Sequence, residues 1–249
     1  MRQQDRPPTP EQIEIARWTA SLGAVTAEAL AQRTGASIAS ARSKLLAARR
    51  RKLLASVRPL SGRPTLFTIT RAGLRACETR GIQICAVSPS NANHLMMCAT
   101  AAAVLERRYP HYRLIGEREL RRDERERGHP LASAKLAISH GVQARLHRPD
   151  LVLYPHDPDG GLPLAVEVEL TIKSPERLVE ICRAWARCRT IAGVIYFAPE
   201  DVQRALRRAV TKVHAFEQVV IVPLDSLKVP DTRLVGRSAA VEGRLDRRI

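Results

Sequence analysis

Apolar residues recur at helical spacing in three successive segments at the start of the chain. The segments run from Thr9 to Gly23, from Thr26 to Gly35 and from Ser37 onward. Each opens on a hydroxyl residue that can cap a helix, and the first two end on a glycine that can stop one. The pattern therefore predicts three helices joined by tight turns, as in a helix-turn-helix.

Two short runs rich in β-forming residues follow, at residues 54–58 and 65–70. They flank a loop that is rich in glycine and proline. Such a pair of runs is typical of a β-hairpin. The hairpin would carry Arg63 at its tip.

The second half of the chain alternates helical and extended segments. The expected order is α-β-β-β-α-β-α-β, and strands separated by a single helix predict a parallel crossover, so the sheet should be mixed. A charged segment at 117–127 is expected to be exposed. The expected helices are at 92–108, 174–189 and 199–215, and the expected strands are at 112–115, 149–154, 162–170, 192–197 and 219–223.

These segments predict an α+β or α/β fold with two domains. Residues 80–91 lack periodicity, which indicates a linker. We expect domains at 1–82 and 93–228, a linker at 83–92 and a flexible basic tail at 229–249.

Positive charge is the strongest feature of the composition. The 249 residues carry a formal net charge of +16, and aromatic residues make up only 4% of them. A charge so far from zero repels itself unless a polyanion is near, so nucleic acid is the first candidate partner and an anionic membrane the second. Stacking of bases on aromatic side chains is disfavoured, because so few are present.

The expected cellular compartment rests on the absence of membrane, secretion and disulfide signals in the sequence. No run of about 18 apolar residues exists, and the first residues do not resemble a secretory signal. Five cysteines without a Cys-x-x-Cys pair argue against a disulfide framework and a zinc finger. We expect a cytoplasmic bacterial protein, associated with the nucleoid or a plasmid, with reduced thiols.

The third helix carries most of the chemistry expected to contact DNA. The helix dipole favours cations only in the last turn, and this helix has more of them than capping requires. Contact with phosphates is the favoured interpretation, and a helical domain that docks on another protein is the alternative. The residues expected to contact duplex DNA are Ser40, Arg42, Ser43, Lys44, Arg49, Arg50, Arg51 and Lys52 of the helix and Arg63 of the hairpin.

Residues 66–73, Leu-Phe-Thr-Ile-Thr-Arg-Ala-Gly, resemble the passage from wing to helix in winged-helix regulators. The resemblance extends over residues 10–80 and implies that the first domain is a winged helix-turn-helix. It also implies a homodimer, because such proteins often read paired half-sites.

Three carboxylates in the second half are candidate metal ligands. Asp150 opens one expected strand, while Glu167 and Glu169 lie two apart on the next and so project from one face. Paired acids in an apolar run are costly unless a cation compensates them. Mg²⁺ or Mn²⁺ suits such oxygen ligands and could activate water for phosphoryl chemistry.

Other interpretations remain open for these acids and for two further features. Glu167 and Glu169 could instead pair with Lys173, Arg183 or Arg187 in a buried network. Glu106 and Glu117 could each add an acid to a metal site, but both are expected to be surface glutamates. The last expected helix carries a charged face that is either a second track for phosphates or simply solvated, formed by Arg204, Arg207, Arg208 and Lys212.

The order of elements and the spacing of the acids resemble the PD-(D/E)xK nuclease superfamily, whose restriction-endonuclease-like core has the order αβββαβ. The resemblance implies that Asp150 and Glu167 bind metal and that the catalytic set is Asp150, Glu167, Glu169 and Lys173. This chain departs from the motif, because Glu169 stands where the lysine belongs. Lys173 could reach Glu169 only if the strand ends near Thr171 and the chain turns. The interpretation that the domain is an inactive relic of a nuclease therefore stays open.

Over residues 10–215 the chain resembles the replication-relaxation family of plasmids and integrative elements. The matching stretches are the hairpin, the helix at His94 and residues 148–153 and 166–174. The resemblance implies a DNA-binding regulator or accessory protein of a mobile element, with a part in transcription regulation. The alternatives are an active Mg²⁺-dependent endonuclease targeted by its winged helix, and a scaffold that recruits a relaxase or replication protein.

Overall fold

The computed structural model describes residues 7–136, 145–157 and 159–228. Contacts divide them into two compact units. The first unit holds residues 7–109 and 115–126, and the second holds 110–114 and the described residues from 127 onward. The expected basic tail at 229–249 lies outside the described residues.

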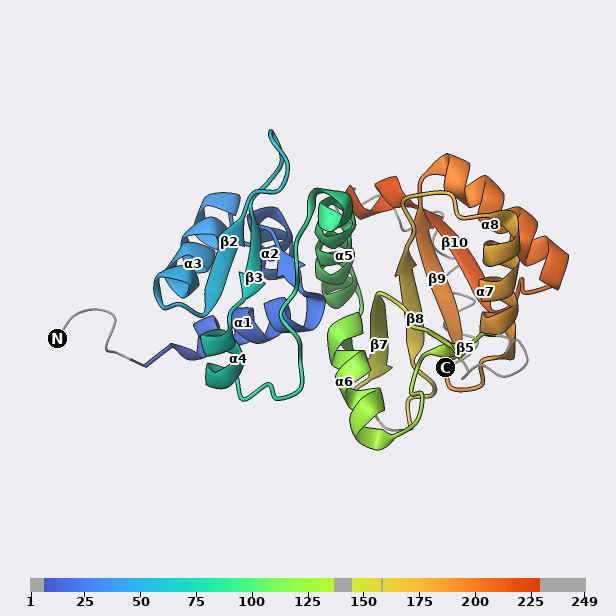
Figure 1. Ribbon diagram of the computed structural model, residues 1–249, viewed down its shortest axis with the longest axis horizontal. Helices are drawn as coiled ribbons and strands as arrows, with labels where there is room; N and C mark the ends of the chain where they lie inside the picture. Colours follow the sequence, from blue (N-terminus) through green and yellow to red (C-terminus); the bar gives the residue numbers. More distant parts are fainter. Residues whose placement is uncertain (1–6, 137–144, 158, 229–249) are drawn as a thin grey trace. The chain divides into compact units, whose positions relative to one another are not determined.

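The first unit consists of helices around a small sheet (Figure 1). The sheet is antiparallel, in the order β1-β3-β2. The elements are α1 (Pro10–Leu22), β1 (Ala24–Val25), α2 (Ala27–Thr34), α3 (Ile38–Arg50), β2 (Leu54–Val57), β3 (Leu66–Ile69), α4 (Arg71–Ala76), α5 (Pro89–Arg108) and α6 (Glu117–Arg127).

The three expected N-terminal helices are confirmed, together with the residues that start them. The side chain of Thr9 accepts a hydrogen bond from the backbone of Gln12, and Ser37 accepts one from Ser40 in the same way. Between α2 and α3, Gly35 adopts a left-handed conformation with φ of 71°, which permits a tight turn. The local capping chemistry therefore sets the angle at which α3 leaves α2.

The expected hairpin is confirmed as well. Strands β2 and β3 pair antiparallel from Leu54 opposite Ile69 to Val57 opposite Leu66. Leu66 is fully buried and packs in one cluster with Ala24 of β1 and Ala92 of α5, so the hairpin is anchored to the helical part of the unit.

Several segments differ from the sequence-based expectation. Three short strands were not expected: β1, β5 (Ala134–Lys135) and β6 (Leu146–His147). Helix α5 begins at Pro89, inside the expected linker, and packs against α2, so the contacts group it with the N-terminal elements. The exposure expected for residues 117–127 does not hold for two of them. The segment forms α6, in which Leu120 and Glu124 are buried, since two inward positions suffice to anchor a short charged helix.

The second unit is built on a mixed five-stranded sheet in the order β10-β9-β8-β7-β4, as expected for a mixed topology. Strands β7 and β8 are antiparallel, whereas β8, β9 and β10 are parallel. The elements are β4 (Tyr112–Gly116), β5 (Ala134–Lys135), β6 (Leu146–His147), β7 (Leu151–Pro155), β8 (Leu164–Val168), α7 (Pro175–Arg187), β9 (Gly193–Ala198), α8 (Glu200–Val213), β10 (Val219–Pro223) and the 3₁₀ turn η1 (Leu224–Lys228).

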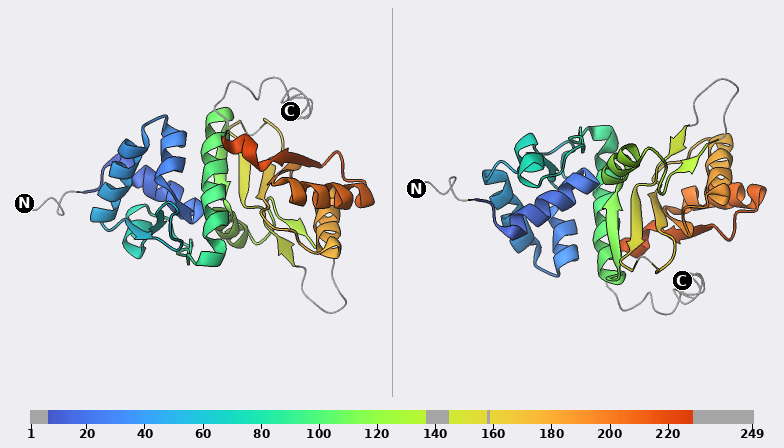
Figure 2. Two further views of the ribbon diagram at one scale, coloured as in Figure 1. Left: turned by 90° about the horizontal axis from the view of Figure 1, so that it is seen from above. Right: turned by 90° about the horizontal axis from the view of Figure 1, so that it is seen from below.

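Helices α7 and α8 pack against each other on one face of this sheet, as Figure 1 and Figure 2 show. Trp185 of α7 and Tyr196 of β9 are among the largest fully buried side chains between these layers. Across the described residues, no helix combines the length and apolar composition needed to cross a bilayer.

A glycine in α4 provides a test of this packing. A Cβ atom at Gly73 would lie 2.2 Å from the carbonyl oxygen of Leu53 and 2.6 Å from Cδ1 of Ile69. We expect Gly73→Ala to lower the free energy of unfolding by about 2–3 kcal/mol, because backbone must move to make room. Urea denaturation measures the loss. The control, Ala76→Ser on the exposed side of α4, should change stability by less than about 0.5 kcal/mol, and an equal loss in both variants would contradict the packing.

Candidate functional site

The structure leaves most of the expected DNA-binding residues accessible on α3 and the hairpin. Lys44 and Arg51 are partly buried. The exposed ones are Ser40, Arg42, Ser43, Arg49, Arg50, Lys52 and Arg63.

A groove of about 230 Å³ lies between α3 and the β2–β3 hairpin. Three arginines line it: Arg42 and Arg49 of α3, and Arg58, which directly follows β2. Ser56 and Thr65 also line the groove and bring hydroxyl groups to it. No acidic side chain is among the lining residues, so the groove is suited to an anion. We call these five residues the arginine groove.

Hydrogen bonds hold two of the three guanidinium groups in place. Nη1 of Arg49 donates to Oγ of Ser56 at 3.0 Å. The guanidinium of Arg58 donates to Oγ1 of Thr65, at 3.2 Å from Nη2 and 3.4 Å from Nε. A guanidinium that is already oriented loses less conformational entropy when it binds an oxyanion.

Arg58 was missed by the sequence analysis, although a signal existed. Alternate residues of a strand point to the same face, so Arg58 follows Ser56 on the side that faces Arg49. In the sequence, this single arginine stands out less than the run of cations at the end of α3.

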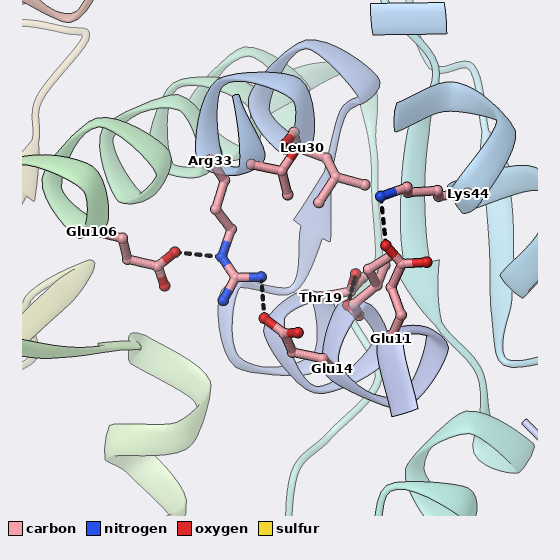
Figure 3. A network of polar contacts seen from close by, with 9 residues as sticks. Glu11, Glu14, Thr19, Leu30, Arg33, Lys44 and Glu106 are labelled. Carbon is pink, nitrogen blue, oxygen red and sulfur yellow. Dashed lines mark hydrogen bonds and ion pairs between the residues drawn. The ribbon is translucent and has the colours of Figure 1, made fainter. Parts of the chain in front are cut away.

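Lys44 has a different environment from the other expected DNA-binding residues. Its Nζ lies 2.5 Å from Oε1 of Glu11 on α1, and its side chain is 33% exposed (Figure 3). Glu11 compensates its charge, so in this structure Lys44 joins α3 to α1.

A second ion-pair network joins α1, α2 and α5 (Figure 3). Arg33 of α2 contacts Glu14 at 2.9 Å and Glu106 at 2.5 Å, and its guanidinium lies 5.0 Å from the ring centre of Trp18. The expectation that Glu106 is a surface residue is wrong, because its side chain is only 18% exposed. Burial raises the pKa of Glu106, although the charge of Arg33 acts to lower it.

The candidate acids of the second unit are buried. Glu167 is 6% exposed and Glu169 is 7% exposed, at and just after the end of β8. Oδ2 of Asp150 accepts a hydrogen bond from the backbone N–H of Val168 at 2.8 Å. The structure thus brings Asp150, which directly precedes β7, to the end of the strand that carries Glu167.

Glu167 faces a histidine that the sequence analysis missed. Nε2 of His147 lies 2.7 Å from Oε1 of Glu167, although the geometry is not that of a well-directed hydrogen bond. The imidazole meets Trp185 edge-on at 5.5 Å, and Nε1 of Trp185 donates to the hydroxyl of Tyr196 at 3.0 Å. The only signal in the sequence was the position of His147, three residues before Asp150.

Burial controls the electrostatics around Glu167. Burial, and to a lesser degree the charge of Asp150, raises the pKa of Glu167, whereas His147 and Lys173 lower it. Burial also raises the pKa of the nearby Cys182 thiol to about 11, with Glu167 adding to the effect. A carboxylate here is stable only beside a cation.

Lys173 supplies one such cation. Strand β8 ends at Val168, earlier than expected, and the chain turns so that the ammonium of Lys173 contacts the carboxylate of Glu169. Burial lowers the pKa of Lys173, while Glu167 and Asp150 act to raise it, which places the lysine within electrostatic reach of both acids. The other two candidate cations, Arg183 and Arg187, are exposed.

These acids can be tested as ligands for a divalent metal. Asp150 and Glu167 have suitable oxygens, but, among the described residues, no three of Asp150, Glu167, Glu169 and His147 bring ligand atoms within 4.8 Å of one another. His147 and Lys173 already lie against the carboxylates of Glu167 and Glu169. In the described part of the chain, these four side chains therefore form no three-ligand metal site, and they resemble an ionic cluster.

The buried Glu106 predicts a pH dependence of stability. Because its folded-state pKa is raised above 4.5, its contribution to stability is present at low pH and is lost as the pH rises through the folded-state pKa. We therefore expect the wild type to become less stable relative to Glu106→Gln as the pH rises from about 4 to about 8. Urea denaturation across this range measures the difference. A wild type that gains stability relative to the variant would mean that the pair with Arg33 outweighs burial.

Comparison with known proteins adds no functional information. No protein-family model, no curated protein and no solved structure matches the chain. The function has to be argued from the arginine groove in the first unit and from the ionic cluster in the second.

Proposed function

We propose that the first unit is a winged helix-turn-helix that binds duplex DNA, with α3 as its recognition helix and the β2–β3 hairpin as its wing. The arginine groove is the observation that carries the proposal. Three guanidinium groups and two hydroxyls converge on a space lined by no acid, between the two elements that such a domain presents to DNA.

The distribution of residues along α3 suits this role. Ser40, Arg42 and Ser43 are exposed in the first half of the helix, where a recognition helix contacts base edges in the major groove. Arg49 and Arg50 are exposed at its end, where cations meet phosphates.

Docking on a protein is the less favoured function of this surface. The centres of protein interfaces are depleted in charged side chains. Here the accessible surface is dominated by arginines. Among the described residues of α3, Ile38 is the large apolar side chain that is exposed, at 53%.

We further propose that the second unit is a nuclease-like scaffold that binds DNA or a partner without cutting. The compensation of Glu167 by His147 and of Glu169 by Lys173 supports this proposal. Together with the resemblance to the replication-relaxation family, it favours a cytoplasmic, homodimeric regulator or accessory protein of a mobile element, which could act beside a relaxase or replication protein.

One observation favours the alternative of an active endonuclease. Lys173 contacts Glu169 and lies within electrostatic reach of Asp150 and Glu167, so an aspartate, a glutamate and a lysine gather at the end of β8. This is the residue set that a PD-(D/E)xK nuclease requires.

The arginine groove predicts a loss of DNA affinity on mutation. We expect Arg42→Ala, Arg49→Ala and Arg58→Ala combined to weaken binding to a duplex of mixed sequence about 10- to 1,000-fold at about 100 mM salt. The slope of log affinity against log salt should fall by about 2–3, since each lost phosphate contact removes about 0.9. Fluorescence anisotropy at several salt concentrations measures both values.

The matched control removes three exposed arginines of the same unit outside the groove: Arg71, Arg75 and Arg80. It should change affinity less than about 3-fold, because only general charge is lost. If both triple variants lose affinity equally, the groove is not the contact.

The ionic cluster predicts an absence of cutting. With supercoiled plasmid and Mg²⁺, we expect the wild-type protein to bind without nicking, because the acids are compensated by His147 and Lys173. Gel electrophoresis of the plasmid, with EDTA and with Asp150→Ala as controls, gives the answer. Nicking that requires Mg²⁺ and disappears in Asp150→Ala would establish the endonuclease instead.

A further inference from the structure

Helices α7 and α8 of the second unit have their C-terminal ends on the same side. They pack against each other on one face of the sheet (Figures 1 and 2). Each connects neighbouring parallel strands, β8 to β9 and β9 to β10, so the two helices run in the same direction. The charged residues in the C-terminal halves of the two helices therefore lie on the same side of the unit.

That surface is cationic. The acids of the two helices lie in their N-terminal halves, from Glu176 to Glu180 and at Glu200 and Asp201. Every charged residue beyond them is a cation, and each is exposed. We call this set the α7–α8 cationic surface: Arg183 and Arg187 of α7, Arg189 just after it, and Arg204, Arg207, Arg208 and Lys212 of α8.

Few of these charges are compensated within the second unit. Arg204 pairs with Glu200 at 2.8 Å, and Arg207 donates to the neutral amide of Gln203 at 2.8 Å. For Arg183, Arg187 and Arg208, the described residues provide no hydrogen bond or ion pair. These three positions are therefore open to an external anion.

Helix dipoles explain only part of this pattern. A dipole favours cations in the last turn, which contains Arg187 of α7 and Lys212 of α8. Arg183, Arg204 and Arg208 lie before the last turn and gain little from it. Like charges three or four residues apart, such as Arg204 and Arg208, also repel each other on a helix. The surface is thus unfavourable for the folded protein on its own.

We propose that the α7–α8 cationic surface is a second site of contact with the phosphate backbone of duplex DNA, formed by other residues than the arginine groove. Six of its seven cations are arginines, whose planar guanidinium matches phosphate oxygens. A membrane is the less suitable polyanion. The apolar faces of both helices are buried, including Trp185 and Leu206, so the helices offer a bilayer no apolar face.

The test is made in the full chain and removes the three cations for which the described residues provide no partner. The variant combines Arg183→Gln, Arg187→Gln and Arg208→Gln. The control combines Arg113→Gln, Arg127→Gln and Arg145→Gln, which removes the same charge from exposed positions of the second unit outside α7 and α8. Circular dichroism and thermal unfolding establish that both variants fold as the wild type does.

Binding is measured by anisotropy with a mixed-sequence duplex of about 24 base pairs over a series of salt concentrations. We expect the surface variant to bind about 10- to 100-fold more weakly at about 100 mM salt, with the salt slope reduced by about 2–3. The control should stay within about 3-fold of the wild type. Equal effects in the two variants, or none in either, would overturn the proposal.

Two further arms distinguish the α7–α8 cationic surface from the arginine groove and from a membrane-binding surface. The surface variant is repeated in the background that lacks Arg42, Arg49 and Arg58, where it should weaken the remaining binding further. No further loss there would show that the groove accounts for all binding. Vesicles of phosphatidylserine and phosphatidylcholine replace the duplex in the second arm, and a variant that loses vesicle binding but keeps DNA binding would assign the surface to membranes.

Discussion

Repulsion between like charges is the constraint on which the rest of this structure depends. The chain has 41 lysines and arginines against 25 acids, so acids are the limiting partner. The structure uses them within its units: Glu14 and Glu106 share Arg33, and Glu11 binds Lys44. Among the described residues, two groups of exposed cations lie on α3 with the hairpin and on α7 with α8. A polyanion at these surfaces would relieve the repulsion, which ties the proposed function to the stability of the protein.

The acidic cluster of the second unit shows the opposite situation. Glu167 and Glu169 are buried, and burial of a carboxylate is costly unless a cation lies beside it. Lys173 contacts Glu169, and Nε2 of His147 lies 2.7 Å from Oε1 of Glu167. A divalent ion at Asp150 and Glu167 would compete with His147 for the carboxylate of Glu167. The chemistry of a nuclease and the stability of the buried layer therefore make conflicting demands on the same residues.

Much of the fold could be predicted from the sequence, because local chemistry determines it. Capping residues such as Thr9 and Ser37 and the stop at Gly35 fixed the N-terminal helices, and the alternation of runs predicted the hairpin and the mixed sheet. Helix α6 was not predicted, because the many charged residues around Leu120 gave no sign that this position is buried. The grouping of α5 with the first unit could not be read from its own residues, since an apolar face does not identify its partner.

The functional site was less predictable, because a charged residue does not reveal in the sequence which element it faces. Arg42 and Lys44 lie two positions apart on α3, so their directions differ by about 200° around the helix axis. Lys44 meets Glu11 of α1, whereas Arg42 lines the groove opposite the hairpin. Both were expected to contact DNA on the same grounds. The acids of neighbouring elements decide which cations form ion pairs within the fold and which remain available to bind DNA. The same reasoning applies to Glu167, which faces His147 and so differs from an acid that is free to bind a metal.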